Sequence, residues 1–317
     1  MFATIKKKLT RWAVLLFIAP LSADRKRHIE RWIRGREEAN KLKRADWVLV
    51  SWGKSGRTWF RVMISHVYKT MYGLAGDVLM GFDNLHRKDS RIPKVFFTHG
   101  NYLQDYTGNV ESRCDFYDKK VVMLVRDPRD VAVSQFFQWQ NRMKPHKKTL
   151  NLYPEHGADI SMFEFVMQEH QGMPGIIRFM NRWAADRANL KDLLVIRYED
   201  LRKEPERVMK QVMDFTGAGA SDGDIKAAVE YAAFENMKKM EAKRVFRMSG
   251  GRMVAKDPNN PDSFKVRRAK VGGFRDYFTD EEVAQINAVM ARDLDPVYGY
   301  DVGEVPAVTP AEAGAAS

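Results

Sequence analysis

The chain has very little cysteine and few long apolar stretches. Cys114 is its only cysteine, so an intramolecular disulfide is impossible, which fits a reducing, cytoplasmic location. No group of cysteines and histidines has the spacing of a zinc site, and no internal repeat is visible. The apolar stretch at 12–21 has ten residues, whereas a membrane-spanning helix needs about 20. The sequence therefore gives no support to a disulfide-stabilised, zinc-dependent or membrane-spanning protein.

Excess positive charge is also nearly absent from most of the chain. The formal net charge is +12, but residues 1–44 contain 13 Lys/Arg and 4 Asp/Glu, which is +9 and leaves only +3 for the rest. A nucleic-acid-binding body would be more basic, so we expect no nucleic-acid partner. With 317 residues, of which 44% are hydrophobic, the chain is long enough to bury a large core.

The first 44 residues differ from the body, which we place at 45–300. Lysines and arginines flank the apolar stretch on both sides, and this pattern favours an interfacial helix on anionic lipids. We therefore predict peripheral contact of residues 1–30 with the cytoplasmic membrane face. A cleavable secretory signal and a helix packed on the protein's own core remain alternatives. Residues 301–317 are expected to be disordered.

Apolar runs alternate with amphipathic stretches along the body. Four short runs predict buried strands, and they are 47–50, 95–98, 121–125 and 193–196. The stretches between or after them predict helices at about 57–72, 128–142, 174–189 and 204–216. This order predicts an α/β fold, with three αβα layers around a central parallel sheet. Polar residues directly follow the four strands and should meet at one sheet edge, and they are Lys54, His99, Arg126 and Tyr198.

The segment Gly53-Lys54-Ser55-Gly56 lies between a strand and a helix and predicts a P-loop-like phosphate-binding turn. The first N–H groups of a helix lack partners within it and favour an anion. The nucleotide triphosphatase motif G-x-x-x-x-G-K-[ST] does not fit, because Lys54 precedes the second glycine. A second basic segment, 243–275, is expected to be a mobile loop that closes over an anion. An ordinary strand-to-helix turn and a solvated surface loop are the alternatives.

Four segments of the body resemble, in order, the motifs of the cytosolic-type sulfotransferases. They are similar to the family's 5′-phosphosulfate loop, its 3′-phosphate motif, its Tyr-Glu-Asp segment and its terminal basic motif, at 54–59, 125–134, 197–201 and 267–275. Gly53 replaces the usual proline before the first motif, and Arg57 replaces its first threonine. The last motif departs from the family pattern at five positions, which are Arg268, Ala269, Gly273, Phe274 and Arg275.

The resemblance implies a sulfotransferase that uses 3′-phosphoadenosine 5′-phosphosulfate (PAPS) as its donor and needs no metal. The residues that it assigns to donor binding are Lys54, Ser55, Gly56, Arg57, Thr58, Trp59, Arg126, Ser134, Tyr198, Phe234, Met237, Arg267, Arg268 and Ala269. The donor carries an anion at each end, and the sequence offers a cationic turn at Lys54 and a second site at Arg126 and Ser134. Trp59 and Phe234 offer flat surfaces for the purine between them.

The catalytic residues implied by the resemblance are His99, Lys54 and Ser134. His99 occupies the place of the family's general base, in Phe97-Thr98-His99, and an imidazole suits proton transfer near neutral pH. Phe97 stands where the family has a lysine, and Arg57 is a candidate to supply the missing cation. We expect direct in-line transfer of the sulfuryl group to a hydroxyl, with Lys54 stabilising the charge on the leaving oxygen.

The identity of the acceptor is not determined by the sequence. Residues 135–156 and a loop at 75–90 are expected to line its pocket, made partly apolar by Phe136, Phe137, Trp139 and Tyr153. With the N-terminal segment, this favours a lipid or amphiphilic alcohol over a phenol or a sugar. Two other functions remain: a P-loop kinase or nucleotide triphosphatase, which would need Mg²⁺ and an acid such as Asp127, and a nonenzymatic membrane-binding module.

Overall fold

The computed structural model describes residues 20–246, 253–257 and 259–301. Most of the apolar stretch for which we predict membrane contact lies outside the described residues, as does Gly250-Gly251 in the basic segment and nearly all of the predicted disordered tail. Within the described ranges, no helix is both long enough and apolar enough to cross a membrane.

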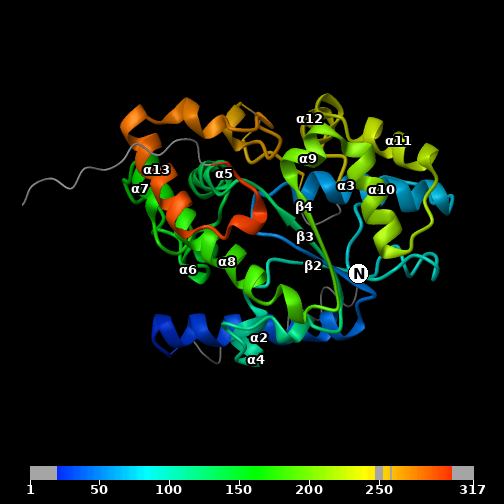
Figure 1. Cartoon of the computed structure of the whole chain (residues 1–317), viewed down its shortest axis with the longest axis horizontal. Coiled ribbons are helices and arrows are strands. Elements are labelled where there is room, and N and C mark those ends of the chain that lie inside the picture. Colours follow the sequence, from blue (N-terminus) through cyan, green and yellow to red (C-terminus); the bar gives the residue numbers. More distant parts are fainter. Residues whose placement is uncertain (1–19, 247–252, 258, 302–317) are drawn as a thin grey trace, which may run out of the picture.

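A parallel sheet of four strands forms the centre of the molecule and confirms the predicted α/β class (Figure 1). Its strands are β1 (Trp47–Val50), β2 (Val95–Thr98), β3 (Lys120–Val125) and β4 (Asp192–Arg197), in the spatial order β2-β1-β3-β4. The chain runs from β1 to β2 on one side and then returns past β1 to β3. Ligands of such sheets bind where this reversal occurs, at the carboxyl ends of the strands.

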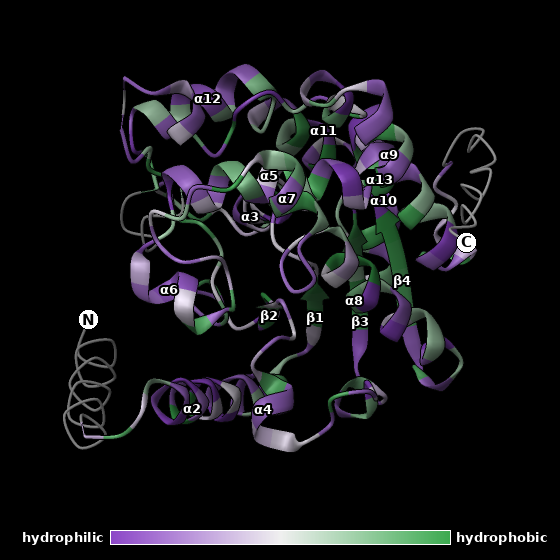
Figure 2. Ribbon diagram, turned by 90° about the vertical axis from the view of Figure 1, so that its left-hand side faces the viewer, coloured by the Kyte–Doolittle hydropathy of each residue, from purple (hydrophilic) through white to green (hydrophobic). Residues whose placement is uncertain are grey.

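Alternate strand residues pack into two separate cores, which makes three layers. Leu49, Val122 and Ile196 face the helices on one side of the sheet. Val48 and Val121 face those on the other side. In Figure 1, α3, α10 and α11 lie on one side of the sheet, whereas α5, α8 and α13 lie on the opposite side. Burial on both faces explains why the strand sequences are continuously apolar, as their green colour in Figure 2 illustrates.

The helices agree closely with the amphipathic stretches of the sequence. Those predicted are observed as α3 (Arg57–Met71), α5 (Pro128–Asn141), α8 (Met173–Ala185) and α10 (Pro205–Thr216). The others are α2 (Ala23–Arg44), α4 (Leu103–Thr107), α6 (Pro145–Leu150), α7 (Met162–Met167), α9 (Tyr198–Lys203), α11 (Asp222–Tyr231), α12 (Phe234–Ala242) and α13 (Asp280–Asp293). Local signals fix several starts: Asp127 caps α5 and Pro128 is its first residue, while capping boxes begin α7, α11 and α13.

Helix α2 runs beneath the sheet and packs against α4 (Figure 2). Gly35 permits the close approach, because a Cβ there would lie only 2.2 Å from the carbonyl oxygen of Tyr102. Arg31 donates to Asp105 at 3.1 Å and to the carbonyl oxygen of Asn101 at 2.7 Å. Helix α2 therefore supports the chain that leaves β2, where the predicted catalytic histidine lies.

Candidate active site

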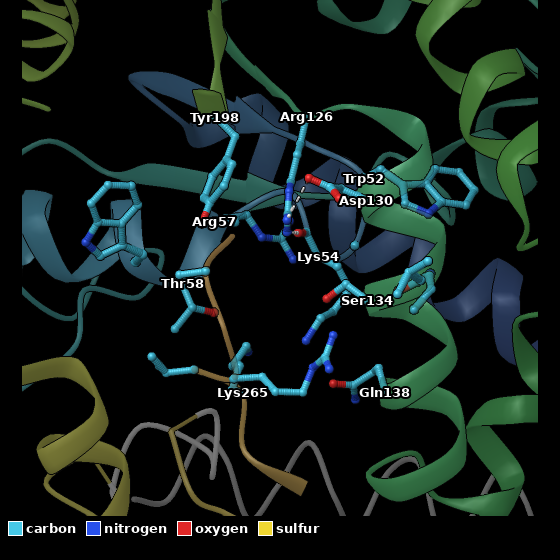
Figure 3. A pocket seen from close by; sticks show the side chains of 18 of the residues that line it. Trp52, Lys54, Arg57, Thr58, Arg126, Asp130, Ser134, Gln138, Tyr198 and Lys265 are labelled. Carbon is cyan, nitrogen blue, oxygen red and sulfur yellow. Dashed lines mark hydrogen bonds and ion pairs between the residues drawn. The ribbon is translucent and has the colours of Figure 1, made fainter. Parts of the chain in front are cut away.

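A cavity of about 420 Å³ opens at the carboxyl ends of the strands. Lys54, His99, Arg126 and Tyr198 all line it, although they come from four different strand ends. The other predicted site residues that line it are Gly56, Arg57, Thr58, Trp59, Ser134, Phe234, Met237, Arg267, Arg268 and Ala269. Ser55 is the exception, because its side chain is buried and does not line the cavity. Figure 3 shows Arg57, Thr58, Ser134, Gln138 and Lys265 around the opening.

The turn after β1 has the backbone geometry of an anion site. Lys54 has φ 71° and Gly56 has φ 92°, both in the left-handed region. Gly56 is the N-cap of α3 and has no side chain with which to cap the first N–H groups of the helix. A Cβ on Gly56 would also lie 2.5 Å from Cδ2 of Tyr198. Only glycine therefore fits between the turn and this ring.

Lys54 lies in a concentration of positive charge. Burial, followed by the neighbouring charges of Arg142 and Arg126, lowers the pKa of Lys54 to about 7. Glu241 opposes these effects only in part. The ammonium form of Lys54 is therefore poorly compensated by the surrounding protein charges, and an anionic ligand would stabilise it.

Arg126 is held at the edge of the cavity by weak contacts. Its Nη1 donates to the carbonyl oxygen of Lys54 at 3.4 Å, and its Nη2 donates to Asp130 at 3.3 Å and to the carbonyl oxygen of Lys270 at 3.1 Å. Its guanidinium lies 4.4 Å from the ring centre of Tyr198. Within the described part of the chain, its buried Nε has no hydrogen-bond partner. These long bonds and the unused donor leave Arg126 able to bind an oxyanion.

The basic segment 243–275, where it is described, is fastened to the body by two buried carboxylates. Glu241, fully buried on α12, accepts from the amides of Lys265 at 2.7 Å and Val266 at 2.9 Å. It also accepts from Arg142 at 3.2 Å. Residues 265–270 of the segment therefore line the cavity. Our sequence reasoning did not select Lys265, for which the only signal was its place in a basic segment.

Asp130 provides the second fastening, on α5. Its carboxylate accepts from the amide of Gly272 at 2.9 Å and from the amide of Phe274 at 3.0 Å, as well as from Arg126. Arg268 instead turns to Asp276, at 2.5 Å. Of the two arginines expected to close over an anion, Arg267 is the more buried, with its guanidinium 3.7 Å from the ring centre of Phe137.

The hydrogen bonds of His99 define its tautomer. Its Nδ1 donates to the carbonyl oxygen of Ser51 at 2.7 Å, so Nε2 carries the lone pair. Arg57 donates to that Nε2 and also to the carbonyl oxygen of Thr98, at 2.5 Å. Burial, followed by the charge of Arg57, lowers the pKa of His99 well below its ordinary value. His99, which lines the cavity, is therefore neutral at pH 7, with the lone pair of Nε2 accepting from Arg57.

Phe97, which replaces the family's lysine, does not line the cavity. Its ring packs on the core that contains α3, where the guanidinium of Arg61 lies 3.7 Å from the ring centre. The cation beside His99 is therefore Arg57, from the phosphate-binding turn. The sequence revealed both substitutions but could not establish that they meet at one imidazole.

Aromatic side chains line the cavity next to Arg126. The rings of Trp59 and Tyr198 lie 6.0 Å apart, edge to face. The Nε1 of Trp59 donates to the carbonyl oxygen of Ala232 at 2.8 Å, which fixes its orientation. Phe234 begins α12 a short distance along the chain, and Met237 follows on the same helix. The arrangement offers apolar faces in the same cavity as the cationic side chains of Lys54 and Arg126.

Two expectations about the acceptor side are wrong. None of residues 75–90 lines the cavity, because this loop packs against α3 instead, where the buried Ser65 hydroxyl accepts from the amide of Met80. Phe136 and Trp139 also stay out of it, since they pack with Phe165 in a small separate core. Phe137 does not line the cavity either. Residues 135–156 do contribute, through polar side chains such as Gln138, through Met143 and, as expected, through Tyr153.

The fold and this arrangement define an α/β protein with a cavity lined by cations at the switch point of its sheet. A family model described as the sulfotransferase domain matches residues 44–297. The chain therefore belongs to the sulfotransferase domain family, as its motifs predicted. The Asp127 carboxylate, which a magnesium-dependent enzyme would need, instead binds Arg129 through both oxygens, at 3.0 and 2.7 Å.

Curated relatives are similar over part of their length. Sulfotransferase 2A6 of Mus musculus is 26% identical over 188 residues, which are 59% of this chain and 59% of the relative. Cytosolic sulfotransferase 17 of Arabidopsis thaliana is 27% identical over 205 residues, 62% of this chain and 54% of the relative. The matched part of the chain thus spans less than two thirds of either relative.

Solved structures share the fold. The mouse sulfotransferase SULT7A1 complexed with PAP has a TM-score of 0.52 and 19% identity, over 81% of this chain and 89% of that one. Retinol dehydratase in complex with androsterone and inactive cofactor PAP has a TM-score of 0.51 and 20% identity, over 78% of this chain and 81% of that one.

Proposed function

We propose that this protein transfers the sulfuryl group of PAPS to a hydroxyl acceptor by direct in-line displacement. The observation that carries the proposal is the shared cavity of Lys54, Arg126 and His99, which come from three separate strand ends. Two cationic positions match a donor with an anion at each end, and a neutral imidazole lies on the same cavity. Adenosine 3′,5′-bisphosphate (PAP) would be the second product.

The chemistry of the lining residues fits this donor. Lys54 and the first amides of α3 would hold the phosphosulfate, because they gather positive charge at one turn. Arg126 and Ser134 would hold the 3′-phosphate. In support, the Nε of Arg126 has no hydrogen-bond partner among the described residues. The ring of Tyr198 packs against Gly56, and Trp59 lies next to that ring. The adenine would therefore lie near Trp59 and Phe234, which line the same cavity.

His99 would act as the general base, with Arg57 as its partner. The base needs the lone pair on Nε2, which now accepts a hydrogen bond from Arg57. Arg57 must therefore release Nε2 when the acceptor hydroxyl arrives, and its charge is then available to the transferring sulfuryl group. Nδ1 stays bound to the Ser51 carbonyl, which keeps the imidazole in the tautomer that can accept a proton. Lys54 would stabilise the leaving oxygen.

A phosphotransferase is the competing enzyme class. It would need carboxylates for Mg²⁺ at the phosphates. Among the described residues, the one carboxylate that lines the cavity is Asp130, and it is already engaged by Arg126 and two backbone amides. The donor set therefore favours sulfuryl transfer, which needs no cation bridge.

The decisive experiment incubates the purified full chain with [³⁵S]PAPS and, separately, with [γ-³²P]ATP and Mg²⁺, using a lipid extract and a soluble extract as acceptors. We expect labelled sulfate in a product, with or without EDTA. Transfer of label from ATP alone would support the phosphotransferase. Tight binding of PAP without turnover on either extract would contradict an enzymatic role.

Location on the cytoplasmic membrane face, through residues 1–30, is also proposed. Support comes from the basic residues that flank the apolar stretch, including Arg25 and Arg27 at the start of α2. The test compares the fraction of the full chain and of a chain lacking residues 1–22 that pellets with anionic vesicles. We expect the truncated chain to stay in the supernatant, and equal pelleting would contradict the proposal.

A further inference from the structure

One part of the cavity wall consists of neutral polar side chains. This wall, which we call the amide wall, comprises five amides and two tyrosines, which are Asn101, Gln135, Gln138, Asn151, Gln171, Tyr102 and Tyr153. Asn101 and Tyr102 are separated from His99 only by Gly100, so the amide wall adjoins the proposed base. Given the proposed function, this is where an acceptor hydroxyl would be presented.

Hydrogen bonds within the amide wall fix its geometry. The hydroxyl of Tyr102 donates to Oδ1 of Asn151 at 2.7 Å, and Nδ2 of Asn101 donates to the same oxygen at 3.2 Å. Nε2 of Gln135 donates to the hydroxyl of Tyr153 at 2.5 Å. The groups are thus preorganised by one another, which lowers the entropy that an acceptor must remove on binding.

Several polar atoms of the amide wall remain available to a ligand. The Tyr153 hydroxyl accepts from Gln135, and burial raises its pKa well above the ordinary value, so it keeps a hydrogen to donate. Gln138 is half-buried on α5, and within the described part of the chain its amide makes no hydrogen bond. An amide offers a donor and an acceptor at once, as does a hydroxyl group.

The apolar side chains that line the cavity come mainly from two core clusters. Met237, Met253 and Tyr198 belong to one cluster, with Trp59 and Val266 packed against it. That cluster surrounds the proposed adenine position, whereas Val133 and Phe274, with Trp52 and Tyr277, line the cavity from the other cluster. The amide wall contributes no aliphatic side chain, so an apolar acceptor placed against it would meet amides with which it cannot pair.

We infer that the acceptor is a carbohydrate hydroxyl, presented by a free oligosaccharide or by the sugar head group of a glycolipid. Each sugar hydroxyl can both donate and accept a hydrogen bond. A row of such hydroxyls can therefore pair with the donors and acceptors of the amide wall. A site built to pair with hydroxyls can reject an analogue without them by about 10⁴-fold. The inference rests on the proposed sulfuryl transfer and replaces the partly apolar acceptor expected from the sequence.

The test supplies [³⁵S]PAPS to the full chain with three kinds of acceptor. One is a pool of hexose and N-acetylhexosamine mono- to tetrasaccharides, one is phosphatidylcholine vesicles with a glycosyl glycerolipid, and one is 4-nitrophenol with a 3-hydroxysteroid. We expect kcat/KM for a sugar arm to exceed that of the apolar arm by at least about 100-fold, consistent with rejection by unpaired polar groups. The two sugar arms distinguish free oligosaccharides from glycolipids.

Equal or greater transfer to the phenol or steroid would overturn the carbohydrate inference and leave the sulfotransferase proposal standing. Absence of transfer to every acceptor would overturn the inference as well. If PAP also failed to bind in equilibrium dialysis, the proposed function itself would fall. The PAP measurement therefore separates the two failures.

Gln138→Met supplies the matching variant, because methionine has the same length without the amide. We expect KM for the preferred sugar to rise about fivefold, the effect of losing one neutral hydrogen bond. Gln140→Met is the control, since Gln140 is exposed on the same helix and does not line the cavity. An unchanged KM in Gln138→Met, with PAP binding showing a folded protein, would contradict the role of the amide wall.

Discussion

The two ends of the cavity are built from different chemistry. At one end, cations surround the turn at Lys54, and the buried carboxylates of Asp130 and Glu241 fasten the segments that carry them. The amide wall, which includes residues next to His99, is neutral and is held by hydrogen bonds among its own members. The difference indicates that the first end fixes the position of an anion, whereas the second selects a partner by the geometry of its polar groups.

The largest expected effect concerns His99, where the two ends meet. His99→Ala should lower kcat for sulfuryl transfer by about 10³-fold, because a positioned general base typically contributes 10²–10⁴-fold. PAP affinity should change by no more than a few-fold, since the anion-binding groups stay in place. Single-turnover transfer and equilibrium dialysis measure the two quantities. His28→Ala, at an exposed position on α2, is the control, and an active His99→Ala enzyme would remove His99 as the base.

The next largest effect is expected when Arg126, at the charged end, is replaced and PAP affinity is measured. Arg126→Ala should weaken PAP binding by about 100-fold, because hydrogen bonds to charged groups contribute about 1.5–3 kcal/mol each. Binding of adenosine 5′-phosphate should weaken far less, since that ligand lacks the 3′-phosphate. Calorimetry with both ligands makes the comparison, with the exposed Arg207→Ala as a control. Equal losses for both ligands would show that Arg126 does not read the 3′-phosphate.

A smaller effect, per pH unit, is expected for the dependence of PAP affinity on pH, and it arises from Lys54 at the charged end. The pKa of Lys54 is lowered to about 7, so free protein loses this charge as pH rises through 7. A bound anion favours the ammonium form, and PAP affinity should therefore fall by up to about tenfold per pH unit above 7. Unfolded lysine keeps its proton to about pH 10.4, so stability of the free protein should rise over the same range.

Calorimetric titrations of PAP from pH 6.5 to 9 measure this dependence. Lys54→Arg is the informative variant, because its side chain remains charged throughout and should flatten the profile. A profile for the wild-type chain that does not change with pH, or that rises, would contradict the assignment of Lys54 to the anion site.

The charged end could be predicted from the sequence because its residues are local to regular elements. A continuous apolar run marks each strand, and Lys54, Arg126 and Tyr198 come at or directly after strand ends. Parallel strands carry such positions to one edge whatever lies between them. The same logic placed His99 on the shared cavity, although not its contact with Arg57, which depends on side-chain packing.

The amide wall could not be predicted in the same way. Its members come from the chain after β2, from α5, and from loops near 151–153 and 171, and no periodic pattern connects them. Aromatic content misled the prediction for Phe136 and Trp139, because an apolar ring in a helix next to a site is equally suited to a core. Lys265 was missed because its direction depends on Glu241, which accepts from the backbone amides of Lys265 and Val266.

The contact between Gly56 and Tyr198 makes two distant positions of the chain interdependent. Because the ring occupies the volume that a side chain at position 56 would need, a larger residue at 56 requires a smaller one at 198. Shrinking Tyr198 alone would leave a hole beside the phosphate-binding turn. Such a hole would admit a nucleotide enlarged at its base, so this pair of residues is the natural place to engineer an enzyme that accepts a donor analogue too bulky for its unaltered relatives.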